Sequence, residues 1–345
     1  MTLFDARWAP APTLHRSRLR AWIRVVVGAA LIAFIVSRVD LSAAAPKSWW
    51  RAAWGVAIAS ALLVLAQYLS ALRWRAVLRT DAPQPRFLFR LYLAGQFFGL
   101  FLPTSVGGDA LRIMWLARAT GRHAIAVASV LVDRLLGLAA LGCYLALGVV
   151  FAGSAAFSTL GLRRNVGMRT VALLGVVGVL VLVVTFGWWR SRGAQQSRPN
   201  RATFLWRIEE ATQLLRRPMR AWIPAAALAM GVQTCYLATW YALTRSLQLP
   251  VPIPFLMLAV PAVSVAAMLP VTISGLGVRE GAWIALLAPL GVAAAEALTC
   301  SLLYFAAFTV VGAIGGLWFS VAGVAPTTNE SPSTRTAPSS AQEVA

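Results

Sequence analysis

The chain has 345 residues, of which 59% are hydrophobic and only 12% are charged, and its mean hydropathy of +0.72 is typical of a protein embedded in a lipid bilayer. This composition excludes a large soluble catalytic domain, because no polar stretch is long enough to form one. The formal charge of +20 would suit nucleic acid, but the basic residues gather in short loops between apolar segments, as in membrane proteins oriented by charge. We therefore expect a polytopic membrane protein that binds no nucleic acid.

Residues 1–20 form a basic arm that we expect in the cytoplasm. The apolar runs that follow lie at about residues 21–37, 54–72, 87–102, 124–152, 170–189, 221–243, 253–270, 281–292 and 296–322. The first run is longer than a typical signal-peptide core, which favours a retained helix, although the small residues at 42–45 would also suit a cleavage site. The segment 324–345 is rich in Thr, Ser, Pro and Ala and is predicted to be a disordered cytoplasmic tail.

Two helix-breaking segments interrupt the apolar runs, LPTSVGGDALR at 102–112 and LPVTISGLGVRE at 269–280. The residues expected to shape them are Pro103, Gly107, Gly108, Pro270, Gly275 and Gly277. Irregular backbone within a bilayer persists only where protein encloses it or where it lines a polar cavity. A pair of such breaks in two halves of a chain is the usual sequence indication of a transporter's substrate site. The alternative is that both are ordinary exposed loops between short crossings.

The distribution of Lys and Arg predicts how the run 87–102 is threaded. If residues 87–122 form a re-entrant hairpin that begins and ends in the cytoplasm, most basic residues lie on the cytoplasmic side, with the loop 73–90 and Arg112 counted among them. If the run crosses fully, the basic residues divide evenly between the two sides. The positive-inside bias therefore favours the hairpin.

The two breaks lie 167 residues apart, and the same offset carries the run 54–72 onto 221–239 and 124–150 onto 291–317. We interpret 54–152 and 221–322 as two halves of a repeat, joined through 170–220 within one transmembrane domain at 21–323. The first spans of the two halves would run in opposite directions, so the repeat is inverted. The prediction is an all-α polytopic membrane protein with six full transmembrane helices, two opposed re-entrant hairpins and both termini in the cytoplasm.

Four acidic residues, Asp109, Asp133, Glu280 and Glu296, fall at or within apolar segments, where a charge at the centre costs at least about 2.5 kcal/mol. Asp109 and Arg112 are three residues apart and share a helix face, so we expect them to pair. Neighbours such as Asp133–Arg134 and Arg279–Glu280 point about 100° apart on a helix, so we expect their partners on other elements. Arg112 is the expected partner of Asp133, and Asp109 that of Arg134.

The candidate residues for this charge network or substrate site are Asp109, Arg112, Asp133, Arg134, Arg279 and Glu280. Purely structural roles are the alternatives: Asp109 as a helix N-cap, Asp133 and Arg134 as a lock between hairpin and span, Glu280 as a first-turn acid and Glu296 as an interfacial residue. We expect no catalytic residue, metal or cofactor, because the three cysteines have no metal-ligand spacing.

The chemistry of these residues suits a phosphate group. Free N–H groups at the start of a half-helix, with Arg112 and Arg279 nearby, bind anions well. We expect the neighbouring apolar residues to form a wall suited to acyl chains; these are Phe97, Phe98, Phe101, Met114, Trp115 and Trp283. Together these features predict a lipid headgroup site.

Four elements of the chain resemble the membrane region of lysylphosphatidylglycerol synthase: Arg73-Trp74-Arg75 after a span, the two breaks described above, and Asp133-Arg134 in the next helix. The resemblance covers roughly residues 20–322. It implies a flippase-like domain in a bacterial cytoplasmic (inner) membrane, which in the full synthase moves aminoacylated lipid between leaflets while a separate soluble domain attaches the amino acid. This sequence contains no such soluble domain, so we expect no lysyl transfer.

We therefore predict a membrane lipid translocase that moves a phospholipid or another phosphorylated lipid between leaflets. Its expected partners are anionic or phosphorylated membrane lipids, with a second copy of the chain or a lipid-biosynthesis protein as a further option. One alternative is a membrane enzyme that modifies a lipid-linked substrate, with Asp109 or Glu280 as general base. Another is a non-transporting partner protein that uses the loop 190–220 for contact.

Overall fold

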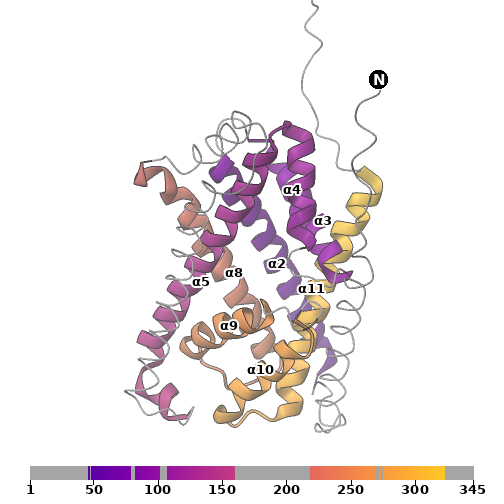
Figure 1. Ribbon diagram of the computed structural model, residues 1–345. Coiled ribbons are helices and arrows are strands. Elements are labelled where there is room, and N and C mark those ends of the chain that lie inside the picture. Colours follow the sequence, from indigo (N-terminus) through magenta and orange to yellow (C-terminus); the bar gives the residue numbers. More distant parts are fainter. Residues whose placement is uncertain are drawn as a thin grey trace, which may run out of the picture.

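The computed structural model describes residues 46, 48–78, 82–101, 107–159, 218–268, 272 and 275–322, and every regular element within them is a helix. In chain order these are α2 (Trp49–Leu78), α3 (Pro85–Phe101), α4 (Gly107–Thr120), α5 (His123–Thr159), η2 (Met219–Trp222), α8 (Ile223–Ser246), α9 (Ile253–Met268), α10 (Val278–Leu287), η4 (Ala288–Leu290) and α11 (Ala294–Ala322) (Figure 1). The predicted helices at 21–37 and 170–189, the arm 1–20 and the tail 324–345 lie outside these residues.

Four of the described helices are long and apolar enough to cross a membrane: Trp49–Leu78, His123–Phe151, Arg220–Ser246 and Ala294–Val321. They correspond to the predicted runs 54–72, 124–152, 221–243 and 296–322. The protein is thus a multi-pass helical membrane protein. One boundary differs from the prediction, because α2 continues to Leu78 and Arg73 lies inside this helix, not in a cytoplasmic loop.

The remaining helices are short and form two pairs, α3–α4 and α9–α10. The longest of them, α3, has 17 residues, which at about 1.5 Å per residue is shorter than the roughly 30 Å thickness of a bilayer core. The α3–α4 pair lies towards the upper end of the bundle and the α9–α10 pair towards the lower end (Figure 1). The helices α3 and α9 end at Phe101 and Met268, 167 residues apart, which is the offset between the two breaks.

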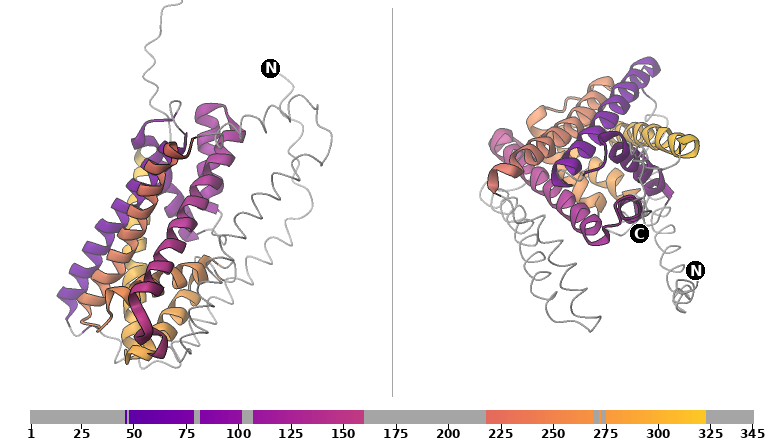
Figure 2. Two further views of the ribbon diagram at one scale, coloured as in Figure 1. Left: turned by 90° about the vertical axis from the view of Figure 1, so that its left-hand side faces the viewer. Right: turned by 90° about the horizontal axis from the view of Figure 1, so that it is seen from above.

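Taking α2–α5 and α8–α11 as the two halves, one short helix of each half packs against a long helix of the other, whereas α4 and α10 remain against α5 and α11 of their own half. The helix α2 packs along α8, whereas α3 packs against α11 of the other half and α9 packs against α5. The long helices lie alongside one another in the side view of Figure 2. Each short pair is therefore enclosed by spans from both halves.

Two glycines permit the exchanged contacts. A Cβ atom added to Gly148 of α5 would lie 2.7 Å from the backbone nitrogen of Leu258 in α9, and one added to Gly315 of α11 would overlap the carbonyl oxygen of Leu93 in α3. Gly148 and Gly315 are also 167 residues apart. Small residues that let backbones approach closely are typical of helix contacts within membranes. The same close contact thus occurs once in each half.

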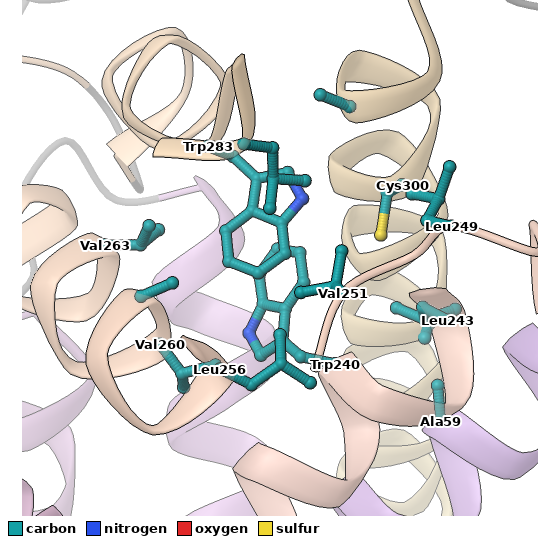
Figure 3. Packing of buried hydrophobic residues seen from close by; sticks show 14 of the residues in the cluster. Ala59, Trp240, Leu243, Leu249, Val251, Leu256, Val260, Val263, Trp283 and Cys300 are labelled. Atoms are coloured by element: carbon teal, nitrogen blue, oxygen red, sulfur yellow. The ribbon is translucent and has the colours of Figure 1, made fainter. Parts of the chain in front are cut away.

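The largest buried cluster joins α8, α9, α10 and α11. The rings of Trp240 and Trp283 lie over each other with centroids 4.1 Å apart (Figure 3), and Tyr304 stacks on Trp240 at 4.4 Å. A second cluster around Trp74, which is fully buried, joins α2, α3, α4 and α5. These two cores hold the short helix pairs in place on either side of the site described below.

Replacing Gly148 by alanine is expected to lower the thermal unfolding midpoint of the purified protein, because the new methyl group overlaps the backbone of α9. Overpacking of this kind costs about 1–3 kcal/mol, and Gly315→Ala should act alike. Gly142→Ala is the matched control on α5, since its Cβ would meet no atom of another described element within 4 Å. Equal midpoints for G142A and G148A in detergent would contradict this account of the packing.

Candidate functional site

Asp133 lies at the centre of a buried ionic network. It projects from α5 and is 2% exposed. One carboxylate oxygen accepts a hydrogen bond from Nε of Arg73 in α2 at 2.7 Å. The other accepts bonds from Nη2 of Arg112 in α4 at 3.2 Å and from the hydroxyl of Tyr92 in α3. One carboxylate thus joins all four helices of the first half.

The network continues through Asp109 towards the surface of the site. Asp109 in α4 accepts a bond from Nη1 of Arg112 at 3.1 Å and another from Nε of Arg134. The predicted pairs Asp109–Arg112, Arg112–Asp133 and Arg134–Asp109 are therefore confirmed. Asp109 lies in the first turn of α4, which begins at Gly107, so its predicted N-cap position is wrong. Its two carboxylate oxygens instead accept hydrogen bonds from Arg112 and Arg134.

Arg112 is held by ring faces as well as by carboxylates. Its guanidinium carbon lies 3.7 Å from the ring centroid of Tyr92 and 4.5 Å from that of Trp74. The residue is 6% exposed, and its Nε atom has no hydrogen-bond partner among the described residues. A buried cation with a donor left over is costly in an apolar environment, so this position suits an additional acceptor.

A smaller ionic group, formed by Arg279 and Glu280, lies at the start of α10. Nη2 of Arg279 donates to Oε1 of Glu280 at 2.6 Å, and Ser301 of α11 donates to the same oxygen at 3.1 Å. The other oxygen of Glu280 accepts the backbone N–H of Gly277 at 2.6 Å. Glu280 lies in the first turn of α10, as predicted.

The prediction that Arg279 and Glu280 cannot pair is wrong. The 100° rotation between neighbouring residues applies to their Cβ directions, whereas the long Arg279 side chain can turn back to the carboxylate. Its guanidinium also lies 5.3 Å from the ring centroid of Tyr304 and 5.4 Å from that of Phe305, which hold it beside α11. Arg279 is thereby placed like Arg112, which stands 167 residues earlier, on the helix that follows the other break.

The glycines of the breaks have separate roles. A Cβ on Gly108 would lie 2.5 Å from the carbonyl oxygen of Gly95, so α3 and α4 meet there almost backbone to backbone. Gly275 and Gly277 have φ angles of +71° and +82°, which other residues rarely adopt. Gly107 is the first residue of α4. Pro103 and Pro270 lie outside the described residues.

A cavity of about 390 Å³ is lined by residues of both short helix pairs, α3–α4 and α9–α10, and of the long helices around them. Three arginines line it, Arg112 and Arg134 from the first half and Arg279 from the second, together with Asp109. Its other polar lining residues are Gln67, Tyr92, Gln96, Gln233, Tyr236, Ser264 and Tyr304, and its larger apolar ones are Leu141, Trp240, Val263, Met268, Phe305 and Phe308. Of the predicted site residues, Asp133 and Glu280 stand behind this lining and hold its arginines.

The apolar wall differs from the prediction. Of the residues expected there, Phe97, Phe98, Met114, Trp115 and Trp283 do not line the cavity. The side chain of Phe101 lies outside the part of the chain that the structure describes. Trp283 is fully buried in the core, and Phe98 and Trp115 pack against Phe319 of α11. The larger apolar lining residues come instead from α8, α9 and α11, with Leu141 from α5.

Several site residues escaped the sequence analysis, chiefly Arg73, Tyr92, Gln67, Gln96 and Ser301. The sequence pattern places Arg73 in a loop, because charged residues usually mark the end of a membrane-spanning helix. A periodic signal was available, since Gln67, Ser70 and Trp74 are spaced as one face of α2 and all are buried. No comparable pattern marks Ser301, whose role depends on the contact between α10 and α11.

Comparison with protein families matches residues 21–316 to the lysylphosphatidylglycerol synthase TM region. The chain belongs to this family. A search of curated proteins finds no match. The assignment to the lysylphosphatidylglycerol synthase TM region agrees with the resemblance carried by the two breaks and by Asp133-Arg134, and it associates the protein with lipid metabolism or translocation in the membrane.

Asp133→Leu is expected to destabilise the protein by about 3–5 kcal/mol, because it leaves Arg73 buried without its carboxylate. The double variant Arg73→Met with Asp133→Leu should recover part of that loss, since it removes both charges. The unfolding midpoint in detergent measures both effects. If the two substitutions are additive, Arg73 and Asp133 are not coupled and the network does not stabilise the fold.

Proposed function

We propose that this protein is a flippase-like lipid translocase that moves a phospholipid or another phosphorylated lipid between membrane leaflets. The observation that carries the proposal is the cavity between the two hairpins, which arginines from both halves line. A cationic cavity inside an apolar helical bundle offers a polar headgroup a place within the membrane. Buried charges in membrane spans commonly mark substrate pathways.

The proposal includes an inverted arrangement of the two hairpins. The pairs α3–α4 and α9–α10 are re-entrant in this scheme and enter from opposite faces, the first from the cytoplasm. Arg73 and Arg112 are buried in the ionic network, so they no longer count as loop charges. Removing both leaves the basic residues still concentrated on the cytoplasmic side under the hairpin threading, in accord with the positive-inside bias.

Phosphate is the headgroup chemistry that the lining supports best. A guanidinium group presents five N–H donors in a planar fork that matches phosphate oxygens. Arg112 and Arg279 each follow a helix start, where the positive end of the helix dipole adds to the attraction for an anion. Two arginines related by the repeat thus approach one cavity from opposite hairpins.

The size of the cavity supports a headgroup and not a whole lipid. Its volume of about 390 Å³ is near the lower end of small-molecule sites, which span roughly 300–1,000 Å³. The acyl chains would remain in the bilayer while the headgroup passes between the hairpins. Trp240, Phe305 and Phe308 supply apolar surface beside this route.

Purified protein reconstituted into phosphatidylcholine vesicles should accelerate the leaflet exchange of fluorescent phospholipids relative to empty vesicles. Loss of fluorescence after addition of a membrane-impermeant quencher measures the exchange. Equal rates in protein-containing and empty vesicles, across several phosphorylated lipid classes, would overturn the proposal. New lipid species in the extracted vesicles would favour an enzyme instead.

The double variant Arg279→Gln with Glu280→Gln should slow the exchange about tenfold, the effect of losing one charge-assisted hydrogen bond to the headgroup. Replacing both residues avoids leaving a buried charge unpaired. Arg245→Gln is the matched control, because Arg245 is exposed on α8 and bonds to the hydroxyl of Tyr241 at 3.1 Å, away from the cavity. Equal rates for the double variant and the control would exclude Arg279 from headgroup binding.

A further inference from the structure

Each carboxylate oxygen of the site already accepts a hydrogen bond from a described residue. Both oxygens of Asp133 are bonded to Arg73, Arg112 and Tyr92, and the residue is 2% exposed. Both oxygens of Asp109 are bonded to arginines. Within the described part of the chain, Asp109 is the only acid that lines the cavity.

Glu280 is saturated in the same way on the opposite hairpin. Its two oxygens accept four hydrogen bonds, two from Arg279, one from Ser301 and one from the N–H of Gly277. It is 2% exposed. Among the described residues, a positively charged headgroup entering the cavity would meet one carboxylate, that of Asp109, whose two oxygens are each already paired with an arginine.

Donors, in contrast, are in surplus. Nε of Arg112, which is itself buried, has no partner among the described residues. The hydrogen bonds that Arg279 makes with described residues use its Nε and Nη2 atoms and leave Nη1. Both arginines line the cavity. Since a guanidinium has no acceptor, only a group that brings acceptors can complete these hydrogen bonds.

Guanidinium groups already lie against four of the ring faces that could attract an ammonium group. The faces of Trp74 and Tyr92 lie against the guanidinium of Arg112, and Tyr304 and Phe305 lie against that of Arg279. An aromatic cage of the kind that binds quaternary ammonium needs such faces free. A second cation placed there would be repelled by the arginine already present.

Two glutamine side chains that line the cavity still have a neutral acceptor oxygen for a ligand. Gln67 donates to Oε1 of Gln96, Gln96 donates to the carbonyl oxygen of Phe308 at 2.9 Å, and Gln233 donates to the carbonyl oxygen of Gly137 at 3.3 Å. The Oε1 atoms of Gln67 and Gln233 accept no hydrogen bond from a described residue. These oxygens suit hydroxyl groups, which can donate while remaining uncharged.

From this surplus of donors and saturation of acids we infer that the cavity selects lipids whose headgroup carries a net negative charge and hydroxyl groups, and rejects aminoacylated and other amine-bearing headgroups. The inference rests on the proposed translocation of a phosphorylated lipid and narrows its substrate class. It separates this protein from a carrier of lysyl lipid, although the family name contains that lipid. Like charges brought together in a site of low polarity oppose binding strongly.

The test compares four lipids that share acyl chains with the same fluorescent label, in vesicles of phosphatidylcholine containing the full-length protein. Phosphatidylglycerol should exchange about tenfold faster than lysyl-phosphatidylglycerol, with phosphatidylethanolamine and labelled phosphatidylcholine nearer the slow lipid. Native mass spectrometry of the detergent-purified protein with the same lipids measures binding separately. Equal rates and equal binding for phosphatidylglycerol and its lysyl form, or a preference for the lysyl form, would overturn the inference.

A charge variant tests the cause of the selectivity. Gln67→Glu adds a nearly isosteric acid to the cavity and should reduce the preference for phosphatidylglycerol severalfold. Gln248→Glu is the matched control, since it adds the same charge at an exposed turn after α8. An unchanged preference in Q67E would overturn the electrostatic explanation.

The two assays keep the proposals distinguishable. If no lipid exchanges faster than in empty vesicles but phosphatidylglycerol still binds in preference, translocation is wrong and the charge selectivity stands. If all four lipids exchange at one accelerated rate and bind equally, translocation stands and the selectivity is wrong.

Discussion

The structure depends on one buried carboxylate. Asp133 on α5 compensates two arginines and accepts a hydroxyl bond, and its three partners come from α2, α3 and α4. A buried charge of this kind is tolerated because both carboxylate oxygens have donors, and the arginines in turn are tolerated because of the acid. The hairpin α3–α4 is thereby fixed to its own half by charge. The position of Arg112 in the cavity follows directly from this constraint.

Apolar contact provides the complementary attachment to the other half. The helix α3 packs against α11 at Gly315, and α9 packs against α5 at Gly148, so each hairpin lies against a span from the other half. These interfaces contain backbone approaches too close for a side chain. Because these contacts bring α3 and α9 against spans of the other half, the cavity is lined by both halves, and most of its larger apolar residues come from α8, α9 and α11.

Hydropathy was sufficient to predict the helices. The runs 87–102 and 253–270 match α3 and α9 within a few residues, and the offset of 167 residues, found from two motifs, recurs in helix ends, paired arginines and paired glycines. Because few opposite charges are available in an apolar chain, the sequence also predicted Arg112 as one partner of Asp133 and Asp109 as the partner of Arg134. Contacts between residues far apart in the sequence, and side-chain conformations, could not be predicted from it. Arg73 looked like a loop residue because nothing local indicates that α2 continues, and the pairing of Arg279 with Glu280 depends on side-chain conformation.

The distribution of ion pairs connects this architecture to transport. The ion pairs of Asp109 and Asp133 lie within the first half, and the pair Arg279–Glu280 lies within the second. The polar contacts that cross between halves are neutral, such as the bond from Gln96 to the carbonyl oxygen of Phe308. Under the proposed function, an anionic headgroup held by both Arg112 and Arg279 would add a charged connection between the halves. Its arrival would favour arrangements in which both arginines face it, so binding of the headgroup would be coupled to the relative position of the halves.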